Sequence, residues 1–71
     1  MKIKLHDVVQ FNEKHKWCGC LGIVCEAKKV GDDVRYMVGV QMPESGTAYI
    51  FVMESAGTIE FIGEALLIES E

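Results

Sequence analysis

The sequence predicts an all-β protein, a small closed sheet of five or six short antiparallel strands. Apolar and polar residues alternate over residues 34–42, which is the side-chain period of a strand. Two glycines, Gly19 and Gly22, stand three residues apart at the start of an apolar run. This spacing indicates a strand that begins tightly against another backbone. Turn residues separate the apolar runs along the chain, as in small all-β folds.

The first half of the chain predicts three strands. Residues 8–11 form the first strand, residues 12–17 a polar loop, and residues 20–28 the second strand. Gly31-Asp32-Asp33 is typical of a hairpin turn. The third strand then covers residues 34–42, with one face formed by Val34, Tyr36, Val38, Val40 and Met42.

The second half predicts two or three further strands. After the turn at residues 43–46, residues 47–53 are β-branched or aromatic almost throughout and apolar on both faces. Residues 58–62 alternate again, Gly63-Glu64 interrupts the pattern, and residues 65–68 give a short last strand. A helix over residues 64–69 is the alternative, although it is too short to be stable unaided.

Length and composition predict one domain over residues 1–71, because a chain of this size holds a single core. An apolar content of 49% is that of a globular protein. No apolar run approaches the roughly 18 residues that span a bilayer, and the charged segment 1–7 lacks the apolar core of a signal peptide. We therefore expect a cytoplasmic protein without a membrane segment.

Charge is divided unevenly along the chain. Residues 1–35 carry seven positive and five negative charges, hence +2, whereas residues 36–71 carry six negative charges, hence −6. A nucleic-acid backbone requires a broad basic surface, so this distribution argues against nucleic-acid binding. It favours a homo-oligomer in which the basic part of one copy meets the acidic part of another.

The pattern Asp7-Val8-Val9-Gln10-Phe11, followed by Trp17, Gly19 and Gly22-Ile23-Val24, is similar to the opening of SH3-like barrels, including the KOW type. The resemblance covers roughly residues 5–42. It implies a small SH3-like barrel. A KOW module would bind nucleic acid as an accessory domain, and a polyproline-binding SH3 domain would offer an aromatic-lined groove.

The whole chain also resembles small open reading frames of bacteriophages and prophages, on the stretches 46–52 and 59–65. This resemblance implies a protein that captures a host component, such as an immune protein or its nucleotide signal. The expected location is then the cytoplasm of the host cell.

The only cluster of metal-ligand type consists of His15, Cys18, Cys20 and Cys25. On a strand, Cys18 and Cys20 would face the same side, and Cys25 the other side unless a bulge intervenes. A zinc-stabilised domain is the alternative to small buried cysteines. No spacing pairs a thiol with His6 or His15 as a catalytic base, so we expect no enzyme, no bound metal and no cofactor.

A binding protein is therefore the expected function, with a host protein or a nucleotide-like ligand as partner. Trp17 either packs at one end of the barrel or offers a surface for stacking. The ligand-binding residues expected from the sequence are Trp17, Lys14, Lys16, Arg35, Tyr36 and Tyr49. The second apolar face of residues 47–53 predicts self-association.

Overall fold

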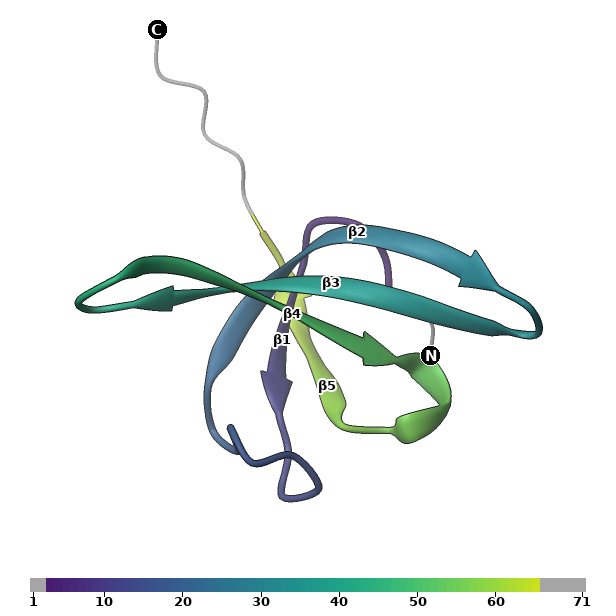
Figure 1. Cartoon of the computed structure of the whole chain (residues 1–71), viewed down its shortest axis with the longest axis horizontal. Helices are drawn as coiled ribbons and strands as arrows, with labels where there is room; N and C mark the ends of the chain where they lie inside the picture. The colour runs from purple at the N-terminus through teal and green to yellow at the C-terminus, as the bar shows by residue number, and fades with distance from the viewer. Residues whose placement is uncertain (1–2, 66–71) are drawn as a thin grey trace, which may run out of the picture.

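The computed structural model describes residues 3–65 and contains five strands (Figure 1). These strands and the single 3₁₀ turn are β1 Asp7–Phe11, β2 Leu21–Val30, β3 Asp33–Met42, β4 Gly46–Met53, η1 Glu54–Ala56 and β5 Ile59–Glu64. The all-β prediction is confirmed. No helix among these residues has the length and apolar character needed to cross a membrane.

All five strands belong to one antiparallel sheet with the order β4-β3-β2-β1-β5. This order leaves β4 and β5 as the two edges. Hydrogen bonds therefore do not close the sheet, which differs from the closed barrel that the sequence predicts. The alternation of residues predicts strands, but closure depends on how far the sheet curls, which alternation does not encode.

The sheet folds over on itself because β2 serves both of its halves (Figure 1). The first residues of β2 pair with β1, while the later residues pair only with β3. The register shifts between Val24 and Glu26, which places Cys25 in a bulge, and bulges bend and twist a strand. The core lies between the two halves and consists of Val9, Phe11, Val24, Tyr36, Val38, Val40 and Val52.

Both hairpin turns depend on glycine. Val30 pairs with Asp33, leaving a two-residue loop whose first residue, Gly31, has φ 63°. Gly46 closes the β3–β4 turn opposite Met42 with φ 87°. Residues with a side chain rarely adopt these angles, so both turns predicted from the sequence have the residue that their backbone requires.

Gly22 permits the close contact between β2 and β3 that the sequence predicts. A Cβ atom at this position would lie 2.5 Å from Val38 Cγ1 and 2.9 Å from the carbonyl oxygen of Gly39. Neither distance is tolerable for a real side chain, so glycine is required by packing here.

The end of the chain differs from the prediction. β5 continues through Gly63 to Glu64, so the expected interruption at Gly63 is wrong. The pairing with β1 shifts between Val8 and Val9. This irregularity accommodates one residue of β5 that has no partner in β1. The alternatives for residues 65–68, a strand or a helix, fall almost entirely outside the residues that the structure describes.

Candidate functional site: the outer face of the sheet

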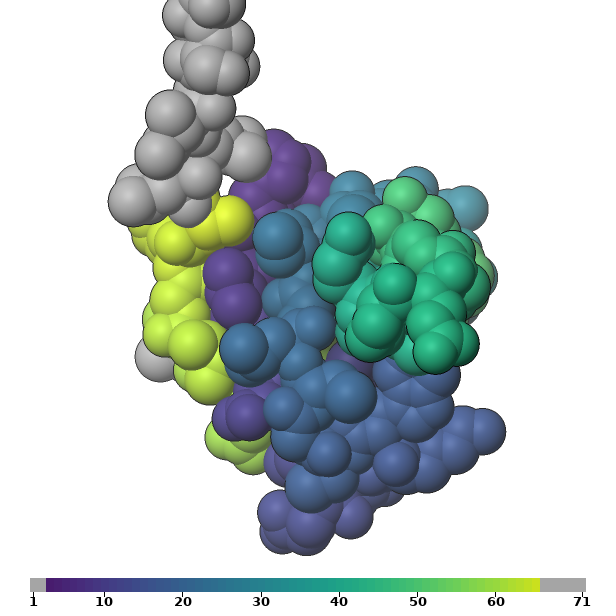
Figure 2. Space-filling model, turned by 90° about the vertical axis from the view of Figure 1, so that its left-hand side faces the viewer, coloured from purple at the N-terminus to yellow at the C-terminus, as the bar shows by residue number. Residues whose placement is uncertain are grey.

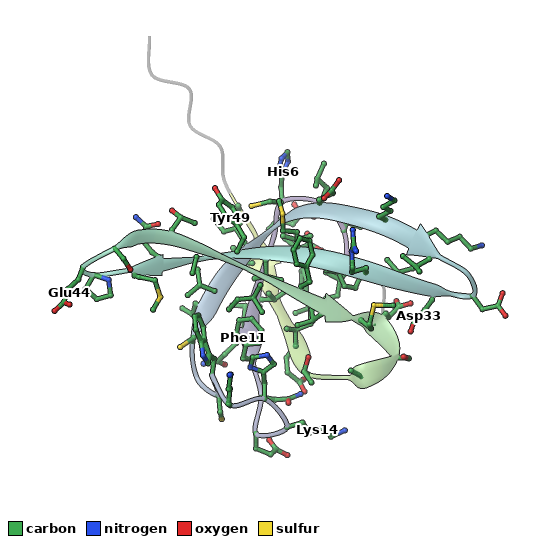
Figure 3. The ribbon with its side chains drawn as sticks, in the orientation of Figure 1. His6, Phe11, Lys14, Asp33, Glu44 and Tyr49 are labelled. Atoms are coloured by element: carbon green, nitrogen blue, oxygen red, sulfur yellow. The ribbon has the colours of Figure 1, made fainter. Side chains whose placement is uncertain are left out.

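The face of the sheet that points away from the core carries a continuous apolar row. Register pairs join Tyr49 to Gly39, Gly39 to Ile23, and Ile23 to Val8, so the row crosses β4, β3, β2 and β1. None of these four residues is charged. Figure 3 shows Tyr49 on one side of the β3–β4 ribbon and the core residue Phe11 on the other.

Large apolar side chains on this face are exposed. Leu21, Ile23, Tyr49 and Phe51 keep 53%, 43%, 57% and 55% of their surface accessible. We call these four residues together with Val8 the outer patch. Single exposed apolar residues are ordinary, but a contiguous group of this kind marks a surface for another molecule.

A hollow lies within the outer patch. It has a volume of about 380 Å³, and its walls are formed by Val8, Leu21, Gly22, Ile23, Gly39 and Gln41. Figure 2 views the molecule from the side on which the β3–β4 turn projects beside β1 and β2. Five of the six wall residues offer only apolar or backbone atoms, so the hollow suits an apolar side chain.

Gly39 shapes the floor of this surface. A Cβ atom there would lie 3.1 Å from Cys25 Sγ and 3.4 Å from Tyr49 Cε1. The absence of a side chain therefore lets Tyr49 and Cys25 lean over the strand. Cys25, which lies at the bulge of β2, contributes to the same surface.

Polar residues border the outer patch at both ends. At one end, Thr47 Oγ1 donates a hydrogen bond of 2.9 Å to Gln41 Oε1. At the other end, the Arg35 guanidinium lies 4.7 Å from the centre of the Phe51 ring, within range of a cation–π contact. An apolar centre with a polar rim is the usual anatomy of a protein interface.

The loop between β1 and β2 holds three of the residues predicted to bind a ligand. Trp17 is partly buried and packs against the core. Of the two roles predicted for Trp17, packing and stacking on a ligand, this placement agrees with packing. Lys14 and Lys16 are exposed, and Figure 3 shows Lys14 on the opposite side of the β3–β4 ribbon from Tyr49.

The other three predicted residues lie on two different faces. Tyr36 is a core residue with 1% exposure, while Arg35 and Tyr49 belong to the outer face. The structure therefore brings together Arg35, Phe51 and Tyr49 along one surface. It does not gather all six predicted residues into one pocket.

A second hollow lies at the edge of the core and has a volume of about 360 Å³. Its walls are formed by Ile3, Tyr36, Glu54, Gly57, Ile59, Glu60 and Phe61. The polar groups here already bond within the fold: Tyr36 Oη donates to Glu54 Oε2 at 3.2 Å, and Asn12 Nδ2 donates to Glu60 Oε2 at 3.0 Å. Burial raises the pKa of the Tyr36 phenol, and the Glu54 carboxylate raises it further.

The cysteines differ from their predicted placement. All three are exposed rather than buried, and Cys18 and Cys20 precede β2 instead of lying on it. Cys25 lies at the bulge of β2, and its Sγ lies beside Gly39 on the outer face. Within residues 3–65, no three His, Cys, Asp or Glu side chains are placed to hold a metal ion.

Sequence reasoning missed three members of the outer patch, namely Val8, Leu21 and Ile23. The signal was present, because residues 21–24 are apolar at consecutive positions except for Gly22, which means apolar residues on both faces of a strand. Comparison with protein-family models, with curated proteins and with solved structures gave no match for this chain.

Proposed function

We propose that this chain is a non-enzymatic binding protein that captures a protein partner through the outer patch. The observation that carries the proposal is the exposed apolar row of Tyr49, Ile23 and Val8 around the hollow at Gly39. Folding does not explain these side chains, since the core lies on the other face. A partner surface that inserts an apolar side chain into the hollow would bury them.

The resemblance to small phage proteins narrows the proposed partner to a host protein, and an anti-defence role is one form of this. A protein is favoured over a nucleotide signal because the aromatic and basic residues expected to hold a nucleotide lie apart: Trp17 packs on the core, while Arg35 and Tyr49 lie on the outer face. The apolar lining of the hollow offers no site for a phosphate.

We also propose that the fold is a partly open version of the SH3-like barrel. The antiparallel order with β5 returning to β1, and the core held between the two halves of the sheet, support this assignment. In this view the barrel provides a rigid support, and the binding surface lies on its outside.

The test is capture of a partner from host lysate by the purified protein and by two variants of β2. Ile23→Lys places a charge in the middle of the outer patch and should abolish capture of the partner that the wild type retains. Val30→Lys makes the same change at a residue with similar exposure, 44%, at the far end of the strand. It should capture normally.

The captured protein is then purified and its binding measured directly with the same three proteins. Equal affinity for the wild type and Ile23→Lys would contradict the proposal, provided that circular dichroism shows both to be folded. Loss of binding with Val30→Lys as well would also contradict it, because the effect would then not be specific to the outer patch.

A further inference from the structure

The two edge strands of the sheet differ in how they are protected. Edge strands expose unpaired backbone groups, and proteins normally guard them with charges, proline, bulges or short length. β5 follows this rule: it has six residues, it includes Glu60 and Glu64, and its pairing is irregular. Any further strand added to β5 would meet both carboxylates.

β4 has none of these protections. Its eight residues, Gly46–Met53, include no charged residue and no proline. Every residue of β4 is paired with β3 on one side, and among residues 3–65 no backbone hydrogen bond outside the sheet involves β4. The free edge is therefore a row of backbone donors and acceptors that lacks a partner within the described part of the chain.

We infer that β4 pairs edge to edge with β4 of a second copy of this chain, forming an antiparallel two-fold dimer with a continuous sheet. The uncharged sequence favours a second copy because each apolar side chain meets the same kind of side chain, and like charges do not oppose one another within the strand. Tyr49 and Phe51 of both copies then share one face.

The proposal differs from partner capture because it uses the edge of the sheet rather than its outer face. A dimer of this kind extends the sheet and leaves Ile23 and Val8 accessible. Glu44 and Glu54 lie just beyond the ends of β4, and antiparallel pairing brings one from each copy toward the other. Association should therefore be weak in low salt and should tighten as salt screens these charges.

The test measures molar mass against concentration, at low and high salt, for the full chain of 7.9 kDa. We expect a shift toward twice this mass as the concentration rises, and a lower dissociation constant in high salt. Tyr49→Lys should raise the dissociation constant at least about tenfold, because it places a charge on the pairing strand. A monomer at all concentrations, or weaker association in high salt, would overturn the proposal.

Two control variants separate the edge from other surfaces. Ile62→Lys changes an exposed residue of the other edge strand, β5, and should leave the dimer intact. Ile23→Lys changes the outer face alone and should also leave it intact. If either variant dissociates the dimer as strongly as Tyr49→Lys, the contact is not made by the β4 edge.

Hydrogen exchange gives a direct view of the pairing. Alternate amides of an edge strand point away from the sheet, so those of residues 46–53 should become protected as the concentration rises. A dimer in which these amides stay exposed would overturn the proposal in favour of stacked faces. Protection that appears only after a captured partner is added would show that the edge accepts a different chain, which also overturns it.

Discussion

The two faces of the sheet contain similar apolar residues but differ in how deeply these residues are buried. Val24 and Val38 on one face are fully buried. Ile23, next to Val24 on β2, and Tyr49 on β4 belong to the other face and keep 43% and 57% of their surface accessible. Burial of the first set stabilises the folded state by about 25 cal/mol for each Å² of apolar surface removed from water. The second set gains little from folding, and this is why we propose that it binds a partner.

The strongest test of the crowded inner face is Gly22→Ala. The added methyl group would collide with Val38 Cγ1 and with the Gly39 carbonyl oxygen, so we expect a loss of about 3 kcal/mol in the free energy of unfolding. Gly63→Ala is the matched control, since a Cβ there meets no atom within 4 Å. Urea unfolding of both variants measures the difference, and equal stability would contradict the described contact between β2 and β3.

The adjacent pair Val24 and Ile23 compares the two faces directly. Val24→Ala removes buried methyl groups and should cost about 2 kcal/mol of stability. Ile23→Ala should cost at most about 1 kcal/mol, because nearly half of this side chain is already exposed, but it should weaken partner capture. The comparison fails if Ile23→Ala proves the more destabilising of the two.

Tyr36 sharpens the comparison through the pH dependence of stability. Because its pKa is raised above 10.0 by burial and by Glu54, the folded state favours the neutral phenol, and stability falls as the pH rises above this ordinary value. Tyr36→Phe should cost about 1 kcal/mol near neutral pH and remove this part of the alkaline decline. Unfolding at a series of pH values measures it, and an unchanged decline in the variant would contradict the assignment.

The smallest effect is expected at Asp33, which joins β3 to η1. The Ser55 hydroxyl donates a hydrogen bond of 2.5 Å to the Asp33 carboxylate, and the Val34 amide donates one of 2.8 Å to the same group. These hydrogen bonds lower the pKa of Asp33 below its ordinary value of 3.8. The stability they contribute is present above this ordinary value and is lost as the pH falls through the lower folded value. Asp33→Asn should therefore show a shallower loss of stability in acid, with partner capture at neutral pH unaffected.

Local sequence signals predicted the strands and turns well. The alternation in residues 34–42 and the turn glycines Gly31 and Gly46 predicted β3 and both hairpins, because these features depend on near neighbours. A bulge near Cys25 was left as an open alternative by the sequence, and the irregularity in the β1–β5 pairing was not predicted. A bulge is set by the register between strands distant in sequence, and this register bears on whether the sheet closes.

The candidate site was only partly predictable for the same reason. The exposed aromatic Tyr49 and the two-sided apolar strand around it were recognised from the sequence. Its neighbours Ile23 and Val8 become visible only when the pairing of β1, β2 and β3 is known. Trp17 was predicted to bind a ligand because it lies in a polar loop, but tertiary packing places it against the core.

The most direct test of the central claim is a map of backbone amide chemical-shift changes as the purified partner is added to the isotopically labelled protein. We predict that the largest changes fall on Val8, Ile23 and Tyr49 and that the loop around Lys14 and Trp17 changes little. Changes concentrated on that loop, with the outer patch unaffected, would contradict the account.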